Sequence, residues 1–220
     1  TIQSAMQINR PSWLVLPYTR AMMGFLLLQD TPKQVWMIGL GAGSIPKFIA
    51  QHLPQTDCTS IELHPQILAL ARSLFALPAD DGKRFQVLLG DGSQFVQGKH
   101  RCVDTILVDG FDGHVVAPEL ATESFFANCY AALRDEGVLA MNLWIHDKLY
   151  PVFLERIKQV FAGQVLCLPT QDKGNVVVFA YKNHRLNWGD KVVRERALYW
   201  QKHTGIEMTD FMGLLHPVKD

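Results

Sequence analysis

The chain has 220 residues, enough for one domain with a large core, and its 48% apolar and 19% charged residues are ordinary for a globular protein. This balance excludes a chain that is disordered throughout. Lys and Arg together number 21, and so do Asp and Glu, so the basic excess typical of nucleic-acid-binding proteins is missing. We therefore expect no nucleic-acid partner.

Cysteine spacing and apolar run lengths indicate the setting in which the protein works. No apolar stretch approaches the roughly 20 residues of a membrane helix, and we find no signal peptide. The chain begins with Thr1, as it would inside a longer parent. The four cysteines form no C-x-x-C pair, so we expect buried free thiols and no metal site. These features favour a cytoplasmic protein without membrane contact.

Apolar runs typical of strands alternate with helical patterns over most of the chain. Strands are expected at 34–38, 57–62, 85–89, 104–109, 137–143, 164–168 and 175–181. Helices are expected at 18–29, 44–52, 66–75, 118–134 and 148–161. Strand–helix–strand repetition implies parallel strands joined by right-handed crossovers.

The last two predicted strands lie too close together for a crossover helix. They therefore form an antiparallel hairpin, with the last strand at or near one edge of the sheet. The predicted fold is α/β: a Rossmann-like sheet of seven mostly parallel strands with an antiparallel C-terminal hairpin. This is the class I S-adenosylmethionine-dependent methyltransferase fold, and it differs from the dinucleotide-binding sheet, where the last strand is also parallel.

Three segments make up the predicted organisation of the chain. Residues 1–16 are expected to form a short strand pair, and residues 17–186 a Rossmann-like cofactor-binding catalytic domain. Residues 187–220 form a tail with one helix at 190–202 and a short second helix. Apolar side chains would pack this tail onto the domain: Trp188, Leu198, Trp200, Phe211 and Leu214.

A glycine-rich turn follows the first predicted strand and precedes a helix. Its glycines are Gly39, Gly41 and Gly43. In an open parallel sheet, ligands bind beyond the carboxyl ends of the strands. Small residues there let the backbone approach a ligand, and helix N-terminal amides face it. The turn is a candidate cofactor-binding element; a plain tight turn is the alternative.

Acidic residues end the second and third predicted strands. Glu62 stands where a carboxylate accepts hydrogen bonds from ribose hydroxyls, with helix capping as the alternative. Asp91, followed by Gly92, is placed to accept a hydrogen bond from an adenine amino group, with an ordinary Asp-Gly turn as the alternative. An acid on the third strand favours an adenosyl-sulfonium cofactor over NAD, and Ser44 departs from the G-x-G-x-x-G pattern.

Two carboxylates, Asp109 and Asp112, leave the fourth predicted strand at the mouth of the same cleft. They predict a site for a cation or amine that faces the cofactor's sulfonium; helix capping is the alternative. His114 is close enough in sequence to reach the cleft, where it would contact the substrate or act as a base; a surface or structural histidine is the alternative. Trp144 is interpreted as a core residue, with the pocket wall as the alternative.

These residues together resemble the spermidine synthase (polyamine aminopropyltransferase) family. The resemblance runs from about residue 3 to residue 181. Family members typically read D-S-S-D-P after the fourth strand, and both acids are present here as Asp109 and Asp112. The other matching positions are Tyr18, the glycine turn, Glu62, Asp91 with its flanking glycines, the strand from Asp104, Leu168-Pro169-Thr170 and Gly174.

The resemblance implies transfer of an aminopropyl group from decarboxylated S-adenosylmethionine to a di- or polyamine. The leaving thioether is neutral and needs no acid, whereas the attacking ammonium must lose a proton. By resemblance, Asp109 accepts that proton and orients the amine, while Asp112 and Tyr18 help to hold the acceptor. The family also implies a homodimer, and residues 1–16 would be the remnant of its N-terminal β region.

Departures from the family pattern keep other functions open. Ala42 stands where the family's glycine loop carries an acid, so a methyltransferase that uses intact S-adenosylmethionine remains an alternative. The family's Tyr-Pro-Ser-Gly stretch reads Gln171-Asp172-Lys173-Gly174, and an inward-pointing Lys173 would repel a cation. A degenerate, non-catalytic cofactor-binding protein is a third hypothesis. The terminal hairpin and Asp91 disfavour an NAD-dependent enzyme.

Overall fold

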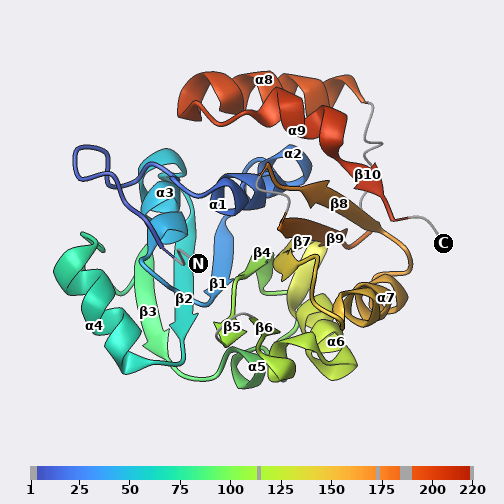
Figure 1. Cartoon of the computed structure of the whole chain (residues 1–220), viewed down its shortest axis with the longest axis horizontal. Helices are drawn as coiled ribbons and strands as arrows, with labels where there is room; N and C mark the ends of the chain where they lie inside the picture. The colour runs from blue at the N-terminus through green and yellow to red at the C-terminus, as the bar shows by residue number, and fades with distance from the viewer. Residues whose placement is uncertain (1–3, 113–114, 172–173, 184–189, 219–220) are drawn as a thin grey trace.

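A sheet of eight strands forms the middle of the molecule (Figure 1). The computed structural model describes residues 4–112, 115–171, 174–183 and 190–218. Within these residues the strand order is β10-β8-β9-β7-β4-β1-β2-β3, and β5 and β6 form a separate pair. The strands are β1 (Gln34–Ile38), β2 (Asp57–Glu62), β3 (Phe85–Leu89), β4 (Val103–Val108), β5 (Phe111–Asp112), β6 (Val115–Val116), β7 (Leu133–Trp144), β8 (Val165–Pro169), β9 (Asn175–Tyr181) and β10 (His216–Pro217).

The strand directions confirm the predicted fold class. β1 pairs in parallel with β2 and β4, and β2–β3 and β4–β7 are also parallel. β9 runs antiparallel to both β7 and β8. One detail differs from the prediction: β10 adds an eighth strand beyond β8, and β9 lies near this edge but inside the sheet. The interior place suits β9, whose central residues are all buried, while a two-residue strand such as β10 has no periodicity to detect.

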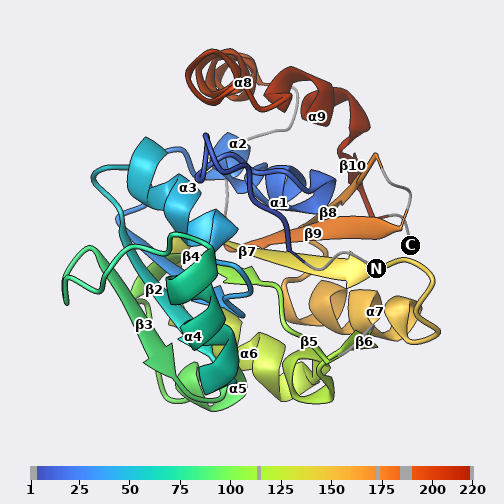
Figure 2. The ribbon, with the colours of Figure 1, turned by 60° about the vertical axis from the view of Figure 1, so that its left-hand side comes forward.

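Helices cover both faces of the sheet (Figure 2). Strand β1 shows why, because Val35 and Met37 point into one apolar core and Trp36 and Ile38 into the other. Helices α1 to α4 cover the first core and α5 to α7 the second. No helix in the described ranges is long and apolar enough to cross a membrane. The helices are α1 (Pro17–Met22), α2 (Phe25–Leu28), α3 (Ser44–His52), α4 (Pro65–Leu74), α5 (Gly92–Phe95), η1 (Pro118–Ala121), α6 (Glu123–Ala132), α7 (Tyr150–Val160), α8 (Lys191–Thr204) and α9 (Met208–Leu214).

Two predicted helices are each divided. The segment 18–29 is interrupted between α1 and α2 at Gly24, where a β-carbon would lie 3.0 Å from the ring of Phe179. The segment 118–134 contains the 3-10 helix η1 and then α6, because the Thr122 hydroxyl accepts the Phe125 N–H at 3.1 Å and starts a new helix. The chain then enters β7 at Leu133, earlier than predicted.

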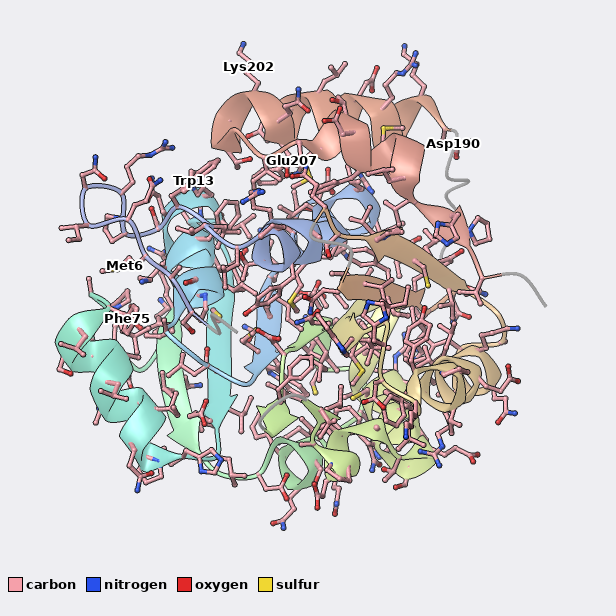
Figure 3. The ribbon with its side chains drawn as sticks, viewed as in Figure 1. Met6, Trp13, Phe75, Asp190, Lys202 and Glu207 are labelled. Carbon is pink, nitrogen blue, oxygen red and sulfur yellow. The ribbon has the colours of Figure 1, made fainter. Side chains whose placement is uncertain are left out.

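The N-terminal segment does not form the expected strand pair. Within residues 4–16 the only strand-like feature is an isolated bridge between Gln7 and Arg10. Met6 of this segment lies near Phe75, just past the end of α4 (Figure 3). The Lys47 ammonium of α3 donates to Met6 Sδ at 3.3 Å and to the Phe75 carbonyl at 2.6 Å. The segment is therefore attached by side chains rather than by a sheet ladder.

The two tail helices, α8 and α9, pack above α1 and α2 (Figure 1). Trp200 and Phe211 are buried, as expected, but Leu198 and Leu214 are 56% and 48% exposed and face away from the domain. Trp188 lies outside the described residues. The Glu207 side chain lies between α9 and α1 (Figure 3), where its carboxylate is 3.0 Å from the Arg20 guanidinium.

The tail also holds α2 through one arginine. The Arg196 guanidinium donates to the carbonyl oxygens of Leu27 and Leu28 at 3.1 and 2.7 Å, and it lies 3.3 Å from the Asp30 carboxylate. A cation at these carbonyls complements the C-terminal end of α2. The tail therefore contacts the domain by charge as well as by apolar packing.

The cysteines are free thiols, as predicted. Cys58, Cys129 and Cys167 are buried, and Cys102 is half-buried. Burial raises the pKa of the Cys58 thiol to about 12, so this thiol stays protonated at neutral pH. These cysteines are packing residues.

Candidate active site

A cavity of about 1120 Å³ opens at the edge of the sheet where the carboxyl ends of the parallel strands meet. The topology brings residues that are far apart in the sequence to this edge. Seven of the predicted site residues line the cavity: Tyr18, Gly39, Gly41, Glu62, Asp91, Gly92 and Asp109.

The other three predicted site residues are not among the described residues that line the cavity. Gly43 lies just behind it, where a β-carbon would be 2.3 Å from a methyl carbon of Leu77. Asp112 belongs to β5, but its side chain is not among those described. His114 lies outside the described residues. The predicted roles of Asp112 and His114 stay predictions.

The glycine turn passes directly beside the end of β4. Gly39 has a φ of 90°, in the left-handed region, and a β-carbon there would lie 2.3 Å from the Asp109 carbonyl oxygen. Only glycine adopts this conformation at that distance without strain. The turn therefore forms one wall of the cavity with its bare backbone.

Glu62 holds the glycine turn in place. Its two carboxylate oxygens accept the backbone N–H groups of Leu40 and His64, each at 2.9 Å, and the residue is only 6% exposed. An ionised carboxylate has about four acceptor positions, so two bonds leave capacity for a ligand's hydroxyls. Glu62 thus fixes the loop that follows each of two neighbouring strands while it faces the cavity.

Asp91 is the N-cap of the short helix α5. One oxygen of its carboxylate accepts the Ser93 N–H at 2.7 Å. Gly92 follows, and a β-carbon there would lie 2.4 Å from a methyl carbon of Ile38. The cap fixes the direction of Asp91 at the cavity edge, so a capping role and a ligand-binding role are compatible in this residue.

Asp109 receives hydrogen bonds from two side chains. The Asn142 amide nitrogen donates to its carboxylate at 2.9 Å, and the Tyr18 hydroxyl donates as well. Burial raises the pKa of Asp109, and these two bonds oppose that rise. Burial and the charge of Asp109 raise the pKa of Tyr18, so its hydroxyl remains protonated and able to donate.

The cavity is also lined by polar residues that the sequence reasoning did not point to, namely Ser4, Thr19, Glu119, Asn142 and Asn175. Asn142 could have been identified from the sequence, because it is a polar residue within the apolar run that forms β7. The sequence carried no signal for Glu119, because its place in the cavity depends on the packing of η1 against Gly110.

Trp144 walls the cavity, so its interpretation as a core residue is wrong. The ring is half-buried and lines the pocket. A β-carbon on Gly174 would lie 2.2 Å from a ring carbon of Trp144, so this glycine lets the indole lie flat against the β8–β9 hairpin. The pocket wall, which was the alternative, is what the structure shows.

The charge of the cavity is one-sided. Its lining, as far as the structure describes it, contains four carboxylates and one histidine, but no lysine or arginine. A partly enclosed site lined by one sign of charge attracts ligands of the opposite sign. The arrangement therefore suits a cation. The four carboxylates and the histidine of the lining are Glu62, Asp91, Asp109, Glu119 and His64.

Comparisons with known proteins agree with this geometry. The family model for the spermine/spermidine synthase domain matches residues 15–189. The chain is 41% identical over 215 residues to the polyamine aminopropyltransferase of Chromobacterium violaceum, covering 98% of this chain and 82% of that protein.

Two solved structures share the fold. Human methyltransferase-like protein 13, in complex with SAH, has a TM-score of 0.76 and 23% identity, covering 86% of this chain and 93% of its own. Spermidine synthase, in complex with the transition state analogue AdoDATO, has a TM-score of 0.72 and 22% identity; the match covers 90% of this chain and 72% of the spermidine synthase chain. The extent of the family match and the identity to the bacterial relative carry the assignment: the chain belongs to the spermine/spermidine synthase family.

Proposed function

We propose that the protein is a polyamine aminopropyltransferase, which moves an aminopropyl group from decarboxylated S-adenosylmethionine to a di- or polyamine. The observation that carries this proposal is Asp109, an oriented carboxylate in a cavity lined by acids and without lysine or arginine among its described residues. The name of the bacterial relative, which aligns over almost the whole chain, supports the same activity.

The charge of the cavity favours the decarboxylated cofactor. Intact S-adenosylmethionine carries a carboxylate, which has no cationic side chain to meet among the described lining residues. The decarboxylated form carries only positive charge on its reacting arm. Glu62 would accept the ribose hydroxyls and Asp91 the adenine amino group, with the glycine turn against the arm. The SAH and AdoDATO complexes of the two solved relatives support a nucleoside in this place.

The chemistry follows from the position of Asp109. The acceptor's ammonium gives a proton to the Asp109 carboxylate, which acts as a general base. The freed nitrogen lone pair forms a bond to the aminopropyl carbon, and the carbon–sulfur bond breaks with its electron pair going to sulfur. The products are a secondary ammonium and neutral methylthioadenosine, and the proton on Asp109 passes to solvent. Alignment of nitrogen and carbon supplies much of the rate enhancement.

A methyltransferase that uses intact S-adenosylmethionine is the second candidate function. The observation that favours it is Ala42 in the glycine turn, because no acid at this position holds the arm of the decarboxylated form. The backbone N–H of Ala42 donates a hydrogen bond to Ser4 Oγ at 3.3 Å.

Calorimetry and product analysis separate the candidates. We expect decarboxylated S-adenosylmethionine to bind more tightly than the intact compound, and mass spectrometry to find an aminopropylated amine. Tighter binding of the intact form with a methylated product would establish the second candidate. Binding of methylthioadenosine without turnover of any di- or polyamine would establish a non-catalytic protein. Asp109→Asn should lower kcat by about 10²–10⁴-fold while the Kd for methylthioadenosine stays unchanged.

A further inference from the structure

Asn142 and Asn175 connect Asp109 to the β8–β9 hairpin by a chain of hydrogen bonds. Asn142 Nδ2 donates to Asp109 Oδ1 at 2.9 Å, and Asn175 Nδ2 donates to Asn142 Oδ1 at 2.9 Å. Asn142 is 3% exposed and lies between Met141 and Leu143, which are both buried. A buried amide that loses a partner costs free energy, so each end of this chain supports the other.

The ionised carboxylate fixes the direction of the whole chain. A carboxylate only accepts hydrogen bonds, so Asn142 must turn its amino group towards Asp109. The Asn142 carbonyl oxygen then faces Asn175, which must donate. If the Asn142 amide turned over, its oxygen would face the carboxylate, and only a protonated Asp109 would be stable beside it. The orientation seen therefore favours the ionised form of Asp109.

Asn175 also belongs to the hairpin that borders the cavity. It is the first residue of β9, and its carbonyl oxygen accepts both the N–H and the hydroxyl of Thr170, at 3.0 and 2.7 Å. Thr170 directly follows β8, so these bonds join the end of β8 to the start of β9. The backbone of Asn175 thus holds Thr170, while its side chain holds Asn142.

We propose that Asn175 is a positioning residue for the reaction: by donating to the Asn142 oxygen it stabilises the one orientation of the Asn142 amide that suits an ionised Asp109, and so helps to keep this carboxylate aimed at the acceptor amine. The inference rests on the proposed function, because that function assigns the general base to Asp109. It adds that the start of β9 is coupled to the base through Asn142. Replacing Asn175 leaves the buried Asn142 oxygen without this donor, so the orientation that suits the ionised Asp109 is less well held.

The test compares Asn175→Ala with a matched control, Asn128→Ala. Asn128 is a half-buried residue of α6 that does not line the cavity. We expect Asn175→Ala to lower kcat about tenfold, as a displaced catalytic group does, with the Kd for methylthioadenosine unchanged. The carbon-13 NMR titration of the Asp109 carboxyl should move to higher pH. The control should change neither.

A change in the Asp109 titration reports the loss of the Asn175–Asn142 hydrogen bond alone, because the other titratable groups that face the cavity are the same in wild type and variant. These groups are Tyr18, Glu62, His64, Asp91 and Glu119. The titration also needs no turnover. If the wild-type protein transfers no aminopropyl group, the proposed function fails, but the titration still tests whether Asn175 acts on Asp109 through Asn142.

A double variant shows whether Asn175 acts through Asn142. If it does, adding Asn175→Ala to Asn142→Leu changes kcat no further, because Asn142→Leu has already removed the hydrogen bonds that link Asn175 to Asp109. An additional tenfold loss in the double variant would overturn the proposal. So would wild-type kcat together with an unmoved Asp109 titration in Asn175→Ala alone, a readout that remains valid if Asn142→Leu does not fold.

Discussion

The Tyr18 hydroxyl donates a hydrogen bond to the Asp109 carboxylate, although Tyr18 lies on α1 and Asp109 follows β4 at the carboxyl edge of the sheet. The two residues approach because α1 packs against β7 and β9, whose ends border the same cavity. The bond stabilises the charged form of a carboxyl group whose pKa burial raises. A helix before the first strand thereby becomes part of the proposed catalytic site.

Tyr18→Phe removes this bond, so the pKa of Asp109 should rise further. Activity requires the ionised carboxylate, so the acid limb of the kcat/KM profile should move to higher pH. At neutral pH the variant should lose about 1.5–3 kcal/mol of unfolding free energy, the value of a hydrogen bond to a charged group. At a pH low enough to protonate Asp109 in both folded and unfolded states, this electrostatic loss should vanish.

Denaturant unfolding at the two pH values and a pH–rate profile check this prediction. The raised pKa means that the folded state binds more protons than the unfolded state, so the Asp109 contribution to stability falls as pH rises. A loss of stability that is equal at both pH values would count against the assigned bond.

Glu62→Gln should loosen the glycine turn. The amide keeps one acceptor oxygen, so one of the two N–H groups of Leu40 and His64 loses its partner. We expect a loss of about 1–3 kcal/mol in unfolding free energy and weaker binding of methylthioadenosine by calorimetry. Glu195→Gln, at an exposed position of α8, is the control and should change stability by less than about 0.5 kcal/mol. Equal effects of the two changes would argue against this role of Glu62.

Glu119→Gln tests whether the acid on η1 holds the acceptor's distal ammonium. Glu119 lines the cavity, and the Ala117 N–H bonded to the Gly110 carbonyl at 3.1 Å holds η1 beside the end of β4. We expect KM for the diamine to rise by up to about fivefold, the value of an exposed ion pair, with kcat unchanged. Glu123→Gln, just beyond on α6 and outside the cavity lining, should leave KM as it is. An unchanged KM in Glu119→Gln would place the distal ammonium elsewhere.

Most of the sheet could be predicted because its signals are local. The strands at Gln34–Ile38, Asp57–Glu62, Phe85–Leu89 and Asn175–Tyr181 match their predicted bounds, since each is a short apolar run beside turn residues. The interior place of β9 could not be predicted, because a hairpin sequence does not say which of its strands pairs with β7. Gly24, at the break between α1 and α2, allows the close approach of Phe179, which lies far along the chain and so gives no local signal.

The candidate site was predictable where a residue's position follows from the topology. Glu62, Asp91 and Asp109 each end a parallel strand or follow one directly, so the sheet itself brings them together. Glu119 depends on how η1 packs, and Asn175 on the register between β7 and β9, and neither is encoded locally. The homodimer implied by the family resemblance also stays a prediction.

The ion pair between Arg20 and Glu207 links the C-terminal tail to the helix that carries Tyr18. No described residue of 190–218 lines the cavity, yet Arg20 shares a helix with Tyr18, and its guanidinium also binds the carbonyl oxygens of Leu14 and Val15. The tail is therefore connected, through Arg20, to the helix whose Tyr18 hydroxyl donates to Asp109. Removal of residues 190–218 would take away the ionic partner of Arg20 while leaving every described wall of the cavity in place.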